Sequence, residues 1–156
     1  MIAYDKLLNE ADKLGIEVNE IIFKSDIKGL YCDNHIRINK KIETGIEKSC
    51  ILAEELGHHY TSAGNILDQN DIRNRKQELK ARAWGYDKKI GLIGLVQAYE
   101  ANCQNKYEMA EYLEVTDEFL QEALIYYENK YGVFTRIDNY AIHFNPYLYI
   151  IKLIKK

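Results

Sequence analysis

The feature that most constrains this chain is the segment ILAEELGHHYT, residues 51–61. At helical spacing, Glu54, Glu55 and His58 fall on one side of this segment, but Ile51 projects among them. We therefore expect this polar side to lie against another part of the protein rather than in water. The opposite, apolar face comprises Leu52, Ala53, Leu56, Gly57 and Tyr60.

Residues 54–58 differ from a known metal-binding pattern at one position. In H-E-x-x-H, two histidines bind zinc and the glutamate after the first acts as a base; here Glu54 takes the place of the first histidine. The pattern alone favours a solvated pair of Glu54 and His58, worth about 0.2–0.5 kcal/mol. A carboxylate on a covered face needs a partner, however, and a divalent metal is one. A register that uses Glu55 and His59 ranks second, because His59 falls toward the apolar edge.

Glycine and alanine in two neighbouring helices predict a close approach of their backbones. Gly57 lies mid-helix, where glycine costs about 0.5–1 kcal/mol relative to alanine, so we expect another backbone to pass beside it. In the next helix, which begins near residue 72, Ala81 and Gly85 share a face with Glu78. Close packing there would bring Glu78 toward His58.

The alternative for Glu78 is a salt bridge to Arg75 or Arg82, one turn away in either direction. The apolar stripe expected to bury this helix lies beside Glu78 and comprises Ile72, Leu79, Ala83, Tyr86 and Ile90.

The remaining patterns indicate an α+β fold. An amphipathic helix is expected over residues 4–14, and residues 18–41 predict two or three strands in a small antiparallel sheet. Two further helices follow, with Thr116 as an N-cap, and a hairpin around residues 138–139 with a last strand ends the chain. We expect residues 1–104 to form one core, with residues 105–156, an acidic helical pair and strands, packed on it.

Charge and composition exclude several classes. The N-terminal stretch carries acidic residues unlike a signal peptide, and no apolar run approaches the ~18 residues of a membrane span. Three scattered cysteines fit a reducing cytoplasm. The pair of helices near residues 107–129 is similar to a helix-turn-helix, but contains seven acidic residues and no Lys or Arg. Phosphates would be repelled, so we expect a protein-docking surface and no direct nucleic-acid binding.

Four stretches together resemble the ImmA/IrrE family of metallo-endopeptidases, in the compact form carried by phages and integrative elements of Gram-positive bacteria. These stretches are CILAEELGHHYTS, GNILD, KQELKARAWGY and YEMAEYLEVTDEFLQEAL. The resemblance implies a small zincin-like fold and cleavage of a helix-turn-helix repressor, which derepresses the genes of the element. It also implies that Glu55 is the general base, His58 a metal ligand and Glu78 the third ligand. Glu54 occupies the position of the first histidine ligand.

The substitution at Glu54 has a chemical consequence. With Glu54, His58 and Glu78 all bound, a zinc centre has a formal charge of zero instead of +1, which predicts slower peptidase chemistry. Zinc is the expected ion, with manganese or another divalent metal as the alternative. The second interpretation is a non-catalytic antirepressor with a structural or degenerate metal site, and the third is a helical interaction domain without metal. Other candidates to line the site are His59, Tyr60, His35 and Arg82.

Overall fold

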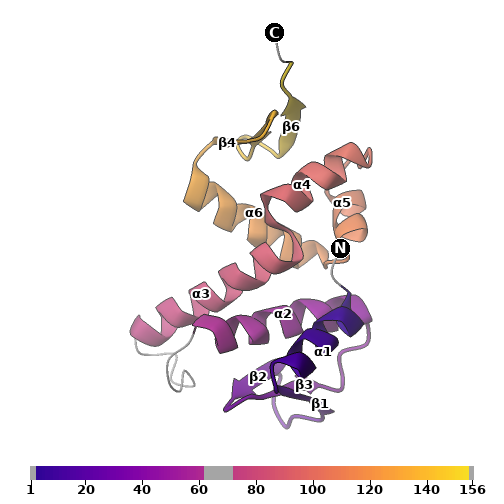
Figure 1. The fold of residues 1–156 in the computed structure, drawn as a ribbon, viewed down its shortest axis with the longest axis vertical. Helices are drawn as coiled ribbons and strands as arrows, with labels where there is room; N and C mark the ends of the chain where they lie inside the picture. Colours follow the sequence, from indigo (N-terminus) through magenta and orange to yellow (C-terminus); the bar gives the residue numbers. More distant parts are fainter. Residues whose placement is uncertain (1–2, 62–71, 155–156) are drawn as a thin grey trace. The chain divides into compact units, whose positions relative to one another are not determined.

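The computed structural model describes residues 3–61 and 72–154 (Figure 1). The expected polar turn over residues 64–71 and the side chain of Ile72 lie outside the described parts. The α+β class is confirmed. The chain divides into two compact units, Ile2–Lys89 and Ile90–Lys156. The division falls earlier than the boundary expected after residue 104.

The first unit combines three helices with a small sheet (Figure 1). Its elements, in chain order, are α1 Tyr4–Lys13, β1 Glu17–Ile21, β2 Gly29–Cys32, β3 His35–Asn39, α2 Gly45–Thr61 and α3 Ile72–Lys89.

The sheet has the strand order β1-β3-β2. Asp33 and Asn34 both adopt positive φ angles, 46° and 62°, as a tight hairpin turn requires, and β2 pairs antiparallel with β3. The expectation of an antiparallel sheet is wrong for the other pairing, because β1 runs parallel to β3. Since β3 inserts between β1 and β2, β2 becomes an edge strand.

The core of this unit joins α1, α2 and the central strand. Leu7 and Ala11 of α1, Ile36 and Ile38 of β3, and Leu52 of α2 are each 0% exposed. Ile36 and Ile38 alternate along β3, so they occupy one face of the sheet. The amphipathic helix expected over residues 4–14 is confirmed as far as Lys13, and Leu14, which follows the helix, is 40% exposed.

The packing of α2 on α3 is closer than ordinary side chains allow. A Cβ atom at Gly57 would overlap the backbone carbonyl of Ala81, and one at Gly85 would lie 3.3 Å from the backbone nitrogen of Glu54. The predicted approach at these small residues is confirmed. The stripe expected to bury α3 is wrong at Leu79, which is 58% exposed, because the small residues, rather than the leucine, face α2.

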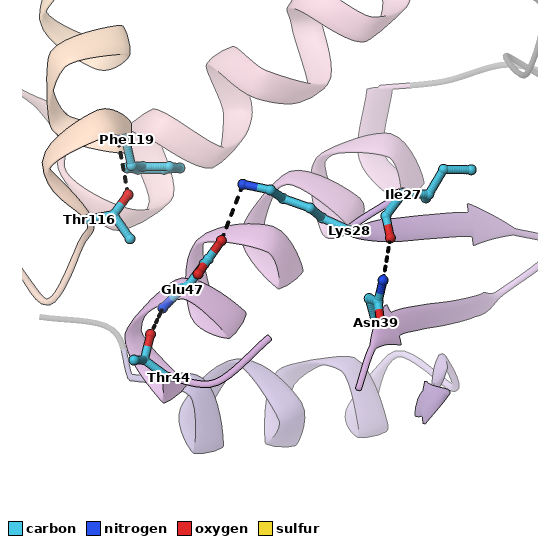
Figure 2. Close-up of polar contacts among 7 residues, drawn as sticks. All are labelled: Ile27, Lys28, Asn39, Thr44, Glu47, Thr116 and Phe119. Atoms are coloured by element: carbon cyan, nitrogen blue, oxygen red, sulfur yellow. Dashed lines mark hydrogen bonds and ion pairs between the residues drawn. The ribbon is translucent and has the colours of Figure 1, made fainter. Parts of the chain in front are cut away.

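The second unit contains three helices and three strands: α4 Gly91–Glu100, α5 Lys106–Leu113, α6 Asp117–Tyr131, β4 Phe134–Ile137, β5 Tyr140–His143 and β6 Tyr149–Lys152. Gly91 has φ +64°, a conformation that suits glycine and separates α3 from α4. The predicted N-cap is confirmed, since Thr116 Oγ1 accepts a hydrogen bond from the Phe119 backbone nitrogen at 3.1 Å (Figure 2).

The strands of the second unit form an antiparallel sheet of order β4-β5-β6. Asp138, at φ 52°, lies in the turn between β4 and β5, as the hairpin prediction requires. Across residues 3–61 and 72–154, none of the helices combines the length and the apolar character needed to cross a membrane.

Candidate metal site

Two helices of the first unit bring together the three residues expected to bind metal. Glu54 and His58 lie one turn apart on α2, and Glu78 lies on α3. His58 Nε2 is 3.1 Å from Glu78 Oε2. Each of the three residues offers one ligand atom, and these atoms all lie within 4.8 Å of one another. One imidazole and two carboxylates at this spacing form a cluster that could hold a divalent metal ion.

Arg82 completes the polar group around the two carboxylates. Its Nε lies 3.3 Å from Glu54 Oε1 and 3.5 Å from Glu78 Oε1. The predicted salt bridge of Glu78 to Arg82 is confirmed, and Glu78 also lies beside His58, because its Oε1 faces Arg82 while its Oε2 faces His58. The His58 side chain is 5% exposed and that of Glu78 17%, whereas Arg82 is 49% exposed. The cluster thus extends from the protein interior to solvent.

The two carboxylates respond differently to their surroundings. Burial, followed by a hydrogen bond with Glu78, raises the pKa of Glu54 to about 7. A hydrogen bond with His58 is the largest cause that lowers the pKa of Glu78 below its ordinary value. Burial and the charge of Glu78 therefore oppose ionisation of Glu54, while the guanidinium of Arg82 favours it. A divalent cation bound by both carboxylates would favour their ionised forms.

Glu55 lies beside this cluster in a different environment. Its residue exposure is 7%. Burial is the largest cause that raises the pKa of its carboxyl well above the ordinary value, and the charges of Glu54 and Glu78 act in the same direction. A carboxylate with a raised pKa accepts a proton readily near neutral pH.

A cavity of about 410 Å³ gives access to these side chains. Residues 27–31, which precede the edge strand β2 and form its first part, make one wall of the cavity. Helices α2 and α3 form the other wall. A Cβ atom at Gly29 would lie 2.6 Å from Ile51 Cγ2 and 3.2 Å from Glu55 Cγ. The prediction that the polar side of α2 is covered is therefore confirmed. The lining residues are Ile27, Lys28, Gly29, Leu30, Tyr31, Ile51, Glu54, Glu55, His58, Glu78 and Arg82.

Specific polar contacts hold the β2 wall in place (Figure 2). Lys28 Nζ donates to Glu47 Oε1 at 3.2 Å, which ties the wall to α2. Asn39 Nδ2 donates to the Ile27 carbonyl at 2.9 Å. Sequence reasoning did not find this wall, although an isolated glycine in a strand pattern, here Gly29, is a signal of close backbone approach.

The other candidates for lining the site lie in different places. Arg82 lines the cavity. His59 Nδ1 lies 2.8 Å from the Tyr31 hydroxyl, so it packs against the β2 wall rather than joining the ligand cluster. Tyr60 stacks on Trp84, with ring centroids 4.8 Å apart. His35 Nδ1 lies 3.2 Å from Glu17 Oε2 at the surface. His59, Tyr60 and His35 are not among the side chains that line the cavity.

The chain matches no protein-family model, no curated protein and no solved structure. The site itself combines three side chains that could hold a metal ion, a buried carboxylate beside them, and a cavity that reaches both.

Proposed function

We propose that this protein is a divalent-metal-dependent endopeptidase of the zincin-like type, encoded by a phage or mobile element. Its proposed substrate is a helix-turn-helix repressor, whose cleavage derepresses the genes of the element. The observation that carries the proposal is the convergence of Glu54, His58 and Glu78 within 4.8 Å, next to the buried carboxyl group of Glu55.

Glu54, His58 and Glu78 would hold the metal, with zinc as the first choice and manganese as the alternative. When bound, a divalent metal supplies Lewis acidity, which makes water available as a nucleophile near neutral pH and polarises a peptide carbonyl. The His58 side chain is nearly inaccessible to solvent, and its Nε2 already faces Glu78 Oε2 at 3.1 Å, so a metal bound between these two atoms would replace their hydrogen bond. The chain therefore contributes a preorganised ligand set rather than flexible surface groups.

Glu55 would act as the general base. It lines the same cavity as the three ligands but is not part of their cluster. From this position its carboxylate can accept the proton of an attacking water and pass that proton to the leaving amine. The raised pKa of Glu55 suits this role, because it makes the carboxylate a stronger base than an ordinary exposed carboxylate.

The edge strand β2 would bind the substrate backbone. Within residues 3–61 and 72–154, β2 pairs with β3 along one side only. Its other side can accept an extended peptide through main-chain hydrogen bonds. Gly29 and Tyr31 of this strand line the cavity, so a peptide added to β2 would pass beside Glu55.

The acidic helices α5 and α6 of the second unit would contact the repressor. Their exposed carboxylates, including Glu111, Glu118 and Glu122, would attract the basic surface with which a repressor reads DNA. A cavity of about 470 Å³ at the start of these helices is lined by Tyr107, Glu118, Glu122 and neighbouring residues. Tyr107 is 73% exposed and offers an aromatic contact of the kind enriched at protein interfaces.

A non-catalytic antirepressor is the second candidate, and Glu54 is the observation that favours it. Replacing a histidine ligand by a carboxylate lowers the charge of the metal centre and so weakens catalysis. In that case the metal would be structural, and the protein would act by binding the repressor.

Cleavage of the repressor encoded beside this protein, measured with metal-loaded wild type and Glu55→Gln, tests the proposal. We expect wild type to cleave, and Glu55→Gln to lose about 10²–10⁴-fold in rate while it retains metal and fold. Glu43→Gln, an exposed carboxylate that precedes α2, is the matched control and should cleave normally. Release of the repressor from DNA without cleavage, equally by wild type and Glu55→Gln, would contradict the peptidase and support the antirepressor.

A further inference from the structure

Arg82 contacts both carboxylates of the proposed ligand set, and one of them is the glutamate that departs from the histidine pattern. We propose that Arg82 is a positioning residue that offsets the extra negative charge of Glu54 and so keeps the metal centre electrophilic. This inference rests on the proposed function, because it assigns a role toward the metal in that same site.

The charges of the site explain why such a residue is needed. A divalent ion held by two histidines and one carboxylate has a formal charge of +1. With Glu54, His58 and Glu78 as ligands the formal charge falls to zero. Arginine stays protonated at any pH at which a protein is folded, so the guanidinium of Arg82 restores one positive charge to the group. Glu54 and Arg82 together thus replace a neutral histidine by a neutral ion pair.

The geometry lets Glu78 face the ligand cluster and Arg82 at the same time, through different oxygens. Glu78 presents Oε2 to His58 at 3.1 Å and Oε1 to Arg82 at 3.5 Å. Arg82 and Glu78 lie one turn apart on α3, while Glu54 belongs to α2. The Arg82 Nε therefore lies close to one carboxylate from each helix, so its charge acts on both carboxylates of the proposed ligand set.

Exposure limits the size of the effect. The Arg82 side chain is 49% exposed, so solvent screens its charge, and the interaction is weaker than that of a buried pair. We expect changes of roughly threefold to tenfold in metal affinity when this charge is removed.

The test measures zinc affinity, by competition with a chelator, for wild type, Arg82→Gln and Arg82→Lys at mildly alkaline pH. Removal of a neighbouring positive charge should tighten zinc binding by about threefold to tenfold in Arg82→Gln, while Arg82→Lys should stay near wild type. Lys80→Gln, an exposed lysine on the same helix, is the matched control and should not change the affinity. If Arg82 only braces the carboxylates, Arg82→Gln should instead weaken zinc binding, and that result, or an unchanged affinity, would overturn the inference.

A second measurement separates this inference from the proposed function. Turnover should fall in Arg82→Gln, and the loss should be larger with Glu54 present than in the Glu54→His background, since the histidine removes the charge that Arg82 offsets. Equal losses in the two backgrounds would overturn the inference. Zinc binding without any cleavage by wild type would overturn the peptidase, while the affinity comparison would still decide the role of Arg82.

Discussion

His58 Nε2 lies 3.1 Å from Glu78 Oε2, although the two residues belong to different helices. The contact depends on the small residues of the helix pair. Gly57 immediately precedes His58, and the carbonyl of Ala81 occupies the space that a side chain at Gly57 would need. The ligand cluster is therefore a consequence of how closely α2 and α3 pack.

Gly57→Ala should separate the two helices. The added methyl group overlaps the backbone of Ala81, and a helix backbone cannot give way as easily as the end of a flexible side chain. We therefore expect a loss of about 1–3 kcal/mol in the free energy of unfolding. Gly45→Ala is the matched control, since nothing lies within 4 Å of its Cβ position, and it should be neutral or slightly stabilising. Chemical denaturation of both variants checks this, and equal stability would contradict the described packing.

The metal-free protein should lose stability as the pH rises from about 4.5 to about 7. Burial raises the pKa of Glu54 across this window, so the folded state keeps a proton that the unfolded state has already released. Glu78, whose pKa is lowered to about 2, gains its stabilisation below about pH 4.5, so its contribution is already complete across this window and does not oppose the trend.

Denaturation of chelator-treated protein across this pH range measures the effect. Glu54→Gln should make the decline smaller, because the amide does not titrate, and the part that remains comes from Glu55, whose pKa is also raised. A metal-free wild type whose stability rises over the same window would show that Glu54 is not held in the environment described.

Glu55→Gln should increase the stability of the metal-free protein at mildly alkaline pH. Glu55 is buried and its pKa is raised, so its ionised form is costly there, and the amide removes that cost. We expect a gain of roughly 0.5–2 kcal/mol, typical of a strained functional residue that is replaced. Thermal unfolding compared with Glu43→Gln checks this, and a clear loss of stability would mean that the Glu55 carboxylate is needed to hold the fold.

Binding of the repressor should weaken as salt increases. The attraction between the acidic helices α5 and α6 and a basic partner is screened by ions. Replacing Glu111, Glu118 and Glu122 by glutamine should lower the affinity at low salt and reduce its salt dependence. Fluorescence anisotropy with labelled repressor measures both, and an affinity that stays constant from low to high salt would exclude this docking surface.

Much of the site could be predicted from the sequence because helical spacing is a local property. The four-residue interval between Glu54 and His58 fixes both on one face of a helix, whatever the rest of the fold does. The family resemblance implied Glu78 as the third ligand, and the small residues at positions 57, 81 and 85 supported it by indicating which faces of the two helices meet. Thr116 and the Asp138 turn are likewise local signals, and the structure confirms both.

The features that were missed depend on contacts between distant segments. Parallel pairing of β1 with β3 follows from the insertion of β3 between two earlier strands, and no strand-level pattern encodes that order. Leu79 fits an apolar stripe by spacing, but it points away because the smaller Ala81 face packs on α2. The β2 wall of the cavity, with Gly29 and Tyr31, joins the site only through tertiary packing.

Zinc titration of the chelator-treated protein tests the central claim most directly. We expect one equivalent of zinc per chain, with an affinity that falls by at least about 100-fold in Glu78→Ala, since loss of even an outer partner of a ligand costs about 10–100-fold. The Glu54→Ala, His58→Ala double variant should bind zinc no better than the unfolded chain. Full, tight occupancy in that double variant, or no zinc bound by the wild type, would contradict the account.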